Sequence, residues 1–243
     1  MDISIIIPAY NESEKISHDI LAADKFLSNQ NFTGEIIIVD DGSSDNTFQI
    51  ANHYKSNSNN YVNVIKLSHN VGKGGAIVEG IKSSKGNIII YADAGLTVPF
   101  ENALVGIELI KNDKCEIANG SRKMKESKIV NAQDFDRKII SRLFGFAVKY
   151  FLKIPKNLTD TQCGFKVYNG DVARNLFPKL ITKGFLFEIE LILLAQKENF
   201  RILEFPVIWS CDRDSRLSIG KSSKKIISDF IFLYRKFISK KII

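Results

Sequence analysis

The feature that most constrains the fold is an alternation, over the first hundred residues, of short apolar runs with stretches of helical periodicity. The apolar runs are rich in β-branched residues and occupy residues 3–7, 35–39, 62–67 and 87–91. Helical candidates separate them at about residues 14–29, 46–56 and 74–84. Strands that are apolar on both faces need helices on both sides of the sheet. The pattern therefore predicts an α/β fold with a mostly parallel, Rossmann-like sheet flanked by helices.

The second half of the chain is less regular and more basic. Residues 137–154 predict a helix that is apolar over most of its circumference, and further helices are expected near 171–177 and 187–198. A strand is expected at 202–209, and a basic, aromatic-rich amphipathic helix at 222–243. We therefore expect one domain over residues 1–221 and a C-terminal helix over 222–243. Such a basic amphipathic helix is typical of a membrane interface, although core packing or a dimer contact would explain the same pattern.

The net charge and the cysteines indicate the kind of partner and the redox compartment of the protein. The formal net charge of +7 over 243 residues favours an anionic partner, which can be a nucleotide, a nucleic acid or an acidic lipid. We expect no nucleic-acid role, because no groove-reading or base-stacking motif is present. The three cysteines are odd in number and form no CxxC pair, which favours a reducing compartment.

Membrane contact is expected to be peripheral. No run of about 18 apolar residues without a charge is present, and the first apolar run begins at Ile3, which leaves no room for a signal peptide. These features predict a cytoplasmic protein.

An acidic turn follows the second apolar run. Asp40 and Asp41 come directly after a predicted buried strand, where carboxylates are costly unless they bind a donor such as the N–H of a base or a ribose hydroxyl. Gly42 permits a tight turn, and Asp45 can cap the next helix. A solvated turn would explain this segment equally well. Loops at the carboxyl ends of parallel strands, including the glycine-rich one at residues 70–75, are also expected to offer backbone N–H groups to a ligand.

Several further motifs occur in order along almost the whole chain. They are Pro8-Ala9-Tyr10-Asn11-Glu12, Asp40-Asp41-Gly42-Ser43, Gly72-Lys73-Gly74-Gly75-Ala76, Tyr91-Ala92-Asp93, Gly120-Ser121-Arg122, Asp160-Thr161-Gln162-Cys163-Gly164-Phe165-Lys166 and Phe187-Glu188-Ile189-Glu190. Together they resemble glycosyltransferase family 2, the inverting enzymes of the GT-A fold, and within it the polyprenyl-phosphate sugar synthases.

The resemblance implies a nucleotide-binding role for one set of residues. Pro8, Tyr10 and Glu12 would line the nucleoside pocket, and Asp40 and Asp41 would lie beside the base and ribose. Lys73 would approach the base or the diphosphate, although a solvated loop lysine is the alternative. Asp93 would lie at the donor diphosphate.

A second set would serve transfer and acceptor binding. The resemblance implies catalytic roles for Asp93, Arg122, Asp160 and Gln162. Arg122, Arg137, Arg142 and Arg216 are candidates for the acceptor phosphate, because arginine forms bidentate bonds to phosphate. Surface positions would explain Arg137 and Arg142 equally well. Of Glu188 and Glu190, we expect one to contact a sugar hydroxyl and the other to face solvent.

The metal motif is incomplete. In the family an Asp-x-Asp motif binds a divalent ion, Mg²⁺ or Mn²⁺, at the donor diphosphate. Here the run is Asp93-Ala94-Gly95, so the second carboxylate is missing, and only Asp93 and Thr97 remain as candidate ligands. The Gly95 departure puts metal use in doubt.

The resemblance implies transfer of glucose from UDP-glucose to dolichyl or another polyprenyl phosphate, on the cytoplasmic face of a membrane. A GDP-mannose-dependent polyprenyl-phosphate mannose synthase is the nearest alternative. A catalytically impaired homologue that only binds nucleotide sugar is the other, because of Gly95.

Overall fold

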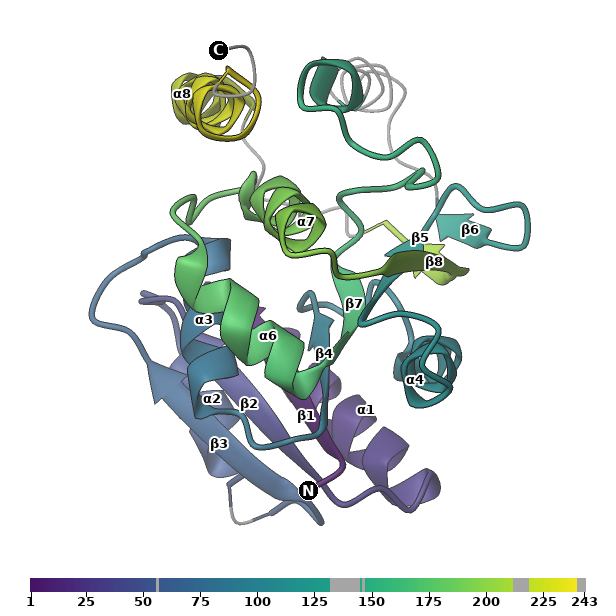
Figure 1. The fold of residues 1–243 in the computed structure, drawn as a ribbon. Helices are drawn as coiled ribbons and strands as arrows, with labels where there is room; N and C mark the ends of the chain where they lie inside the picture. Colours follow the sequence, from purple (N-terminus) through teal and green to yellow (C-terminus); the bar gives the residue numbers. More distant parts are fainter. Residues whose placement is uncertain (56, 132–144, 146, 212–218, 240–243) are drawn as a thin grey trace.

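A seven-stranded sheet forms the centre of the protein, as seen in a computed structural model that describes residues 1–243 except 56, 132–144, 146, 212–218 and 240–243 (Figure 1). Its strand order is β3-β2-β1-β4-β7-β5-β8. The strands are β1 (Ile3–Ala9), β2 (Gly34–Asp40), β3 (Tyr61–Lys66), β4 (Ile88–Ala92), β5 (Ile117–Ser121), β7 (Phe165–Asn169) and β8 (Ile202–Pro206). All neighbours pair in parallel except β7, which runs antiparallel to β4 and β5. The predicted mostly parallel sheet is confirmed.

Helices cover both faces of the sheet. They are α1 (Ile16–Asn29), α2 (Thr47–His53), α3 (Lys73–Ser83), α4 (Ala103–Lys111), α6 (Gly170–Leu176), α7 (Phe187–Lys197) and α8 (Ile219–Phe237), with 3-10 turns η1 (Phe100–Asn102) and η2 (Phe177–Lys179). Side chains of α1, α2 and α4 join one buried cluster, and those of α3, α6 and α7 join another on the opposite face. Strands β1, β2 and β4 are buried on both faces, which explains their continuous apolar runs, whereas the edge strands β3 and β8 are partly exposed.

The expected strand at 202–209 is instead two strands in different sheets. The chain leaves the main sheet after Pro206, and β9 (Ile208–Ser210) pairs with β6 (Lys128–Asn131) in a separate two-stranded sheet. Proline has no N–H to continue a ladder, which is consistent with the break. Helix α4, strand β6 and the reversed direction of β7 were not predicted from the sequence.

The C-terminal helix packs against the body of the protein. Helix α8 begins at Ile219, three residues before the expected boundary, and its Leu233 is fully buried. A third buried cluster joins α8 to α7 and to the segment around Val148 and Leu152. Of the helix expected at 137–154, the described part is helical at residue 145 and from 147 to 151. Among the described helices, none is both long and apolar enough to cross a bilayer.

Candidate active site

The acidic turn after β2 is hydrogen-bonded to the loop that precedes α3. The Asp41 carboxylate accepts the N–H groups of Val71 at 2.7 Å and Gly72 at 3.0 Å, so it fixes the loop that precedes α3. Burial raises the pKa of Asp41, although these two bonds act in the opposite direction. Gly42 has a φ of 70°, and a Cβ there would lie 2.6 Å from the backbone of His69. The turn therefore requires glycine at this position.

Asp40 is the more available of the two carboxylates. It is fully buried, and its Oδ1 accepts the Ser43 N–H at 3.1 Å. Its Oδ2 has no hydrogen-bond partner among the described residues. A buried carboxylate oxygen without a donor is costly, so this atom is suited to a ligand N–H or O–H group.

The first loop lies against the acidic turn. Asn11 donates its N–H to Ser43 Oγ at 2.8 Å, and Asn11 Oδ1 accepts the Ser44 N–H at 2.8 Å. The Glu12 N–H donates to Thr47 Oγ1 at 2.8 Å. Pro8 is half-buried and pairs with Val39, whereas Tyr10 is exposed. A groove of about 450 Å³ lies here, lined by Asn11, Glu12, Ser13, Glu14, Lys15, Ser44 and Asp45. The loop and the turn thus form one surface, and of the residues predicted to line a nucleoside pocket Glu12 lines this groove.

Lys73 and Asp93 form an ion pair at the carboxyl end of β4. Lys73 Nζ lies 2.7 Å from Asp93 Oδ1 and 2.9 Å from Oδ2, and the Tyr91 hydroxyl donates to Oδ1 at 2.6 Å. The Lys73 ammonium also lies over the rings of Tyr91 and Phe187. Burial opposes its charge, yet the Asp93 carboxylate and Glu188 raise the pKa of Lys73. Lys73 is therefore a fixed cation and not a solvated loop lysine.

The segment at residues 70–75, which leads into the first turn of α3 and is called the Lys73 loop below, has glycines that allow close packing. The N–H groups of Gly74 and Gly75 donate to the carbonyl oxygen of Lys183, at 2.9 Å and 3.4 Å. A Cβ on Gly74 would lie 2.7 Å from Phe187 Cβ. The expectation that this loop offers its N–H groups to a ligand is therefore wrong for these two amides, which are already bonded within the protein.

The donor-side and acceptor-side motifs meet at Gly164. The Asp93 N–H donates to the Gly164 carbonyl at 2.8 Å. A Cβ on Gly164 would lie 1.9 Å from Asp93 Oδ2, so the carboxylate lies directly on this glycine. Because Gly164 is two residues from Gln162, the segment of Asp160 and Gln162 is held against the Lys73–Asp93 pair.

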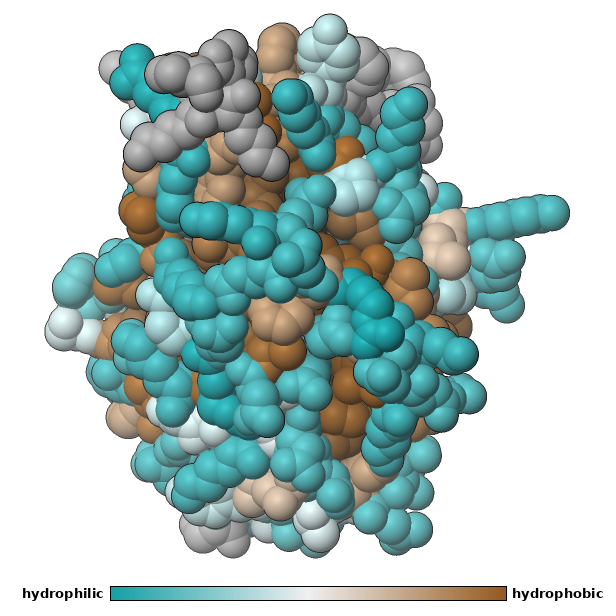
Figure 2. Space-filling view, in the orientation of Figure 1, coloured by the Kyte–Doolittle hydropathy of each residue, from teal (hydrophilic) through white to brown (hydrophobic). Residues whose placement is uncertain are grey.

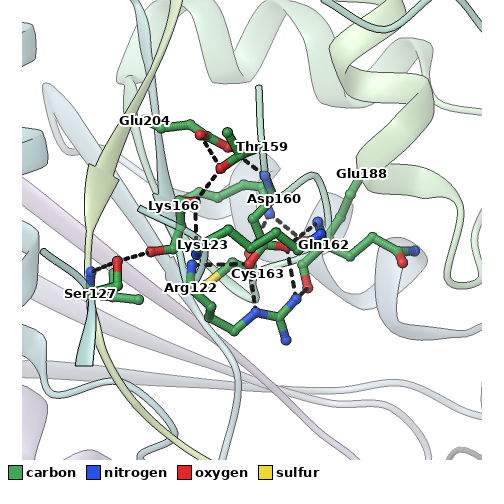
Figure 3. A network of polar contacts seen from close by, with 12 residues as sticks. Arg122, Lys123, Ser127, Thr159, Asp160, Gln162, Cys163, Lys166, Glu188 and Glu204 are labelled. Carbon is green, nitrogen blue, oxygen red and sulfur yellow. Dashed lines mark hydrogen bonds and ion pairs between the residues drawn. The ribbon is translucent and has the colours of Figure 1, made fainter. Parts of the chain in front are cut away.

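Arg122 and Asp160 form a bidentate ion pair (Figure 3). Arg122 Nε donates to Asp160 Oδ2 at 2.6 Å and Nη2 to Oδ1 at 2.8 Å, and Nη2 also donates to the Gln162 carbonyl at 3.2 Å. Burial raises the pKa of Asp160, but the Arg122 guanidinium outweighs it and lowers that pKa to about 2. Arg122 also lies over the Trp209 ring, 5.3 Å from its centroid. Among the described residues, no hydrogen bond of Nη1 is found, so this nitrogen is available to a ligand.

Glu204 of β8 supports the Asp160 segment from behind (Figure 3). It accepts the Asp160 N–H at 2.7 Å and the Thr159 hydroxyl at 2.7 Å. Glu204 was not predicted from the sequence, although a lone acid in a predicted apolar strand was a signal for it. Lys166 and Glu188 form a buried ion pair at 2.5 Å beneath the same segment, and Lys166 also donates to the Cys163 carbonyl.

The expected solvent exposure of one glutamate of α7 is wrong. Glu188 and Glu190 are both buried, with exposed fractions of 3% and 0%. Glu188 bonds Lys166, and Glu190 bonds the loop before α7 together with Lys236 of α8. Neighbouring elements cover both sides of the helix, so residues two apart on it are both enclosed.

The loop of the incomplete metal motif is held by Asp19 of α1. The Asp19 carboxylate accepts the N–H groups of Gly95 at 2.9 Å and Leu96 at 2.9 Å, and burial raises its pKa to about 7 against the effect of those bonds. Gly95 has a φ of 91°, a conformation that an aspartate adopts only with strain. Asp19 was also missed, although an acid between Ile16 and Ile20 on the buried side of a helix was a signal.

Of the two carboxylates of an Asp-x-Asp metal motif, this chain has only that of Asp93. Among the described residues no group of three or more His, Cys, Asp or Glu side chains could hold an ion. Thr97 is half-buried, and its carbonyl accepts the Ser210 N–H at 2.9 Å. Arg137, Arg142 and Arg216 lie outside the described residues.

The protein has an α/β fold, and two ion pairs, Lys73–Asp93 and Arg122–Asp160, lie at the carboxyl-end edge of its parallel strands. A family model described as glycosyl transferase family 2 matches residues 4–177, more than half of the chain. The chain belongs to glycosyltransferase family 2.

Particular relatives refine the picture. The chain is 34% identical over 240 residues to a dolichyl-phosphate β-glucosyltransferase of Dictyostelium discoideum, covering 94% of this chain and 72% of the relative. It is 32% identical over 249 residues to the human dolichyl-phosphate β-glucosyltransferase, covering 98% and 76%. In structure it is similar to glucosyl-3-phosphoglycerate synthase from Mycobacterium tuberculosis in complex with UDP, with a TM-score of 0.71, 18% identity and coverage of 96% and 80%. Another structure of that enzyme contains Mn²⁺ and UDP-glucose. At this identity the structural likeness supports the fold alone.

Proposed function

We propose that this protein transfers glucose from UDP-glucose to dolichyl or a related polyprenyl phosphate, with inversion at the anomeric carbon. The observation that carries the proposal is the junction at Gly164, where the Lys73–Asp93 pair touches the segment of the Arg122–Asp160 pair. In this proposal the donor site and the anion-binding acceptor site would be adjacent. The names of the most similar relatives supply the sugar and the lipid acceptor.

The donor nucleoside would occupy the surface between the first loop and the acidic turn. Pro8, Tyr10 and Glu12 are proposed to line it, and Asp40 Oδ2 would accept a base N–H or a ribose hydroxyl. Asp41 would act by holding the loop of Val71 and Gly72 in place. Lys73 would bind the diphosphate, which would replace Asp93 as the partner of its ammonium.

The acceptor needs little activation. The second pKa of a phosphate monoester is about 6, so the lipid phosphate is mostly a dianion at neutral pH and attacks the anomeric carbon without a dedicated base. The new C–O bond forms as the bond to UDP breaks, and UDP leaves with the electron pair. The protein positions two anions and neutralises their charge. Arg122 Nη1 is proposed to bind the acceptor phosphate, with Arg137, Arg142 and Arg216 as further candidates, while Asp160 and Gln162 orient Arg122.

A divalent ion would be held at this site by one carboxylate together with the substrate. Mg²⁺ in particular is commonly held by one or two carboxylates together with substrate phosphates and waters. Asp93 would supply the carboxylate once Lys73 turned to the diphosphate, and Thr97 could contribute its hydroxyl. We propose that Mg²⁺ or Mn²⁺, when bound, adds positive charge at the leaving diphosphate.

We further propose that the protein works as a peripheral enzyme on the cytoplasmic face of a membrane, with residues 1–221 as the transferase domain and 222–243 at the interface. The outer side of α8 exposes Ile227 by 59% and Ile231 by 45%. The neighbouring segment exposes Tyr150 and Phe151, and the Phe151 and Phe230 rings are 6.2 Å apart. With Lys225 and Arg235 exposed on the same helix, this surface suits anionic lipid.

The Gly95 position favours a second candidate, a homologue that binds nucleotide sugar without turnover. A panel of radiolabelled UDP-glucose, GDP-mannose and other nucleotide sugars, supplied with polyprenyl phosphate, separates the candidates. We expect a lipid-linked product with UDP-glucose, and its loss with EDTA if the ion is required. UDP binding without a lipid product from any donor would favour the impaired homologue and contradict the proposal.

A further inference from the structure

The loop between η2 and α7, residues 181–184, lies between the Lys73 loop and α8. Helix α3 has Gly72 at its N-cap and no side-chain cap, so its first turn needs an acceptor from elsewhere. The Lys183 carbonyl is that acceptor for Gly74 and Gly75. A Cβ on Gly72 would lie only 2.6 Å from the same oxygen. The residues on both sides of Lys73 are therefore in direct contact with this loop.

Glu190 holds the loop from the opposite side. Its Oε2 accepts the N–H of Ile181 at 3.0 Å, the N–H of Thr182 at 2.7 Å and the Thr182 hydroxyl at 2.7 Å. Its Oε1 accepts Nζ of Lys236 in α8 at 2.8 Å. Glu190 has no exposed surface, whereas the Lys236 side chain is 29% exposed. One buried carboxylate therefore joins the C-terminal helix to the loop that caps α3.

Helix α8 also lies over the end of this loop. A Cβ on Gly184 would lie 3.7 Å from the Asp229 carboxylate and 3.9 Å from the Lys225 side chain. Contacts therefore run without interruption from α8 through Glu190 and the loop to the α3 terminus, and then through Lys73 to Asp93.

We infer that Glu190 is a positioning residue for donor binding, through which the docking of α8 sets the Lys73 loop. Without the Lys236 ammonium, the buried Glu190 carboxylate keeps only the uncharged donors of Ile181 and Thr182. A buried carboxylate without a cation is costly, so its present position is disfavoured. The loop at Thr182 and Lys183 then loses its anchor, and Lys73 loses a fixed approach to the diphosphate. This inference rests on the proposed function, since it takes a nucleotide sugar as the donor.

The test compares Lys236→Met with Arg235→Met, a matched change on the exposed side of the same helix. UDP binding is measured by calorimetry and steady-state constants with UDP-glucose and polyprenyl phosphate. We expect Lys236→Met to raise the dissociation constant of UDP and the KM for UDP-glucose by at least about fivefold. The KM for the lipid acceptor should change less than about twofold, and Arg235→Met should leave UDP affinity unchanged.

A double variant, Lys236→Met with Glu190→Gln, removes both charges and leaves no unpaired carboxylate. It should bind UDP more tightly than Lys236→Met alone, a rescue that general loss of stability would not produce. Wild-type UDP affinity in Lys236→Met, together with a lower melting temperature, would overturn the inference and leave the proposed function standing. Wild-type protein that binds no UDP would overturn both.

Discussion

At the scale of single residues, the Arg122–Asp160 pair links stability to pH. The Asp160 side chain is 2% exposed, and Arg122 lowers its pKa to about 2 from an ordinary 3.8. A depressed folded-state pKa gives stability that is complete above the ordinary value and is lost as pH falls toward the folded value. Asp160→Asn should therefore lower the free energy of unfolding by on the order of 2 kcal/mol at pH 7. The deficit should shrink between about pH 4 and pH 2.

Urea denaturation at a series of pH values measures this effect. Asp171→Asn is the matched control, because the Asp171 side chain is 93% exposed in its pair with Arg174 and should contribute little. A deficit for Asp160→Asn that stayed constant down to pH 2 would show that the pair does not govern the acid response.

Gly164 tests the contact between the two halves of the site. A methyl group at this position would meet the Asp93 carboxylate at 1.9 Å, so Gly164→Ala must displace Asp93 or the segment of Gln162. We expect UDP affinity to fall about tenfold, because overpacking of this kind costs about 1 to 3 kcal/mol. Gly145→Ala is the control, since a Cβ there meets nothing within 4 Å. Equal UDP affinity in both variants, measured by calorimetry, would argue against Asp93 at the donor site.

At the scale of elements, α8 has two faces with different roles. Leu233 is fully buried against α7, while Ile227 and Ile231 are exposed one turn apart on the outer side. Ile227→Glu with Ile231→Glu should leave the fold intact and reduce binding to anionic vesicles at least about tenfold, because both buried apolar area and charge attraction are lost. Flotation with phosphatidylserine vesicles measures it. Val105→Glu, at an exposed residue of α4, is the control and should not change vesicle binding. Equal flotation of all variants would contradict the proposed membrane surface.

The sequence predicted those elements whose apolar pattern is local. Strands β1 to β4 begin and end within two residues of the predicted runs, because apolar residues make up most of each strand and β1, β2 and β4 are buried on both faces. The antiparallel direction of β7 could not be predicted, since strand direction depends on how distant segments pair and not on local periodicity. The break between Pro206 and Ile208 was missed because β8 and β9 form one continuous apolar run.

The sequence motifs named charged residues that the structure brings into ion pairs, but they did not predict which residues pair. The motifs pointed to Lys73, Asp93, Arg122 and Asp160, and the structure pairs them as Lys73–Asp93 and Arg122–Asp160. Neither pair follows from spacing, because partners 20 and 38 positions apart meet only in the folded sheet. Asp19, Glu190 and Glu204 act on backbone N–H groups, and motifs of side chains do not report such bonds.

At the scale of the whole molecule, the first half of the chain builds the proposed donor side and the second half builds the proposed acceptor side. Strands β1, β2 and β4 place the acidic turn and Asp93, and β5 and β7 place Arg122 and the segment before Lys166. Helix α8 lies at the end of the molecule away from the N-terminus, with α7 between it and the sheet (Figure 1). Figure 2 shows hydrophilic residues interspersed with apolar ones on the face of the molecule that is also viewed in Figure 1.

The proposed arrangement would bring a nucleotide sugar and a phosphate acceptor together for one displacement. The most direct measurement is the anomeric configuration of the lipid product formed from UDP-glucose and polyprenyl phosphate, determined by NMR. Because UDP-glucose carries an α linkage, a single inverting displacement must give a β-glucosyl phosphate lipid. An α-linked product, or no lipid-linked glucose at all from a protein that binds UDP, would contradict the account.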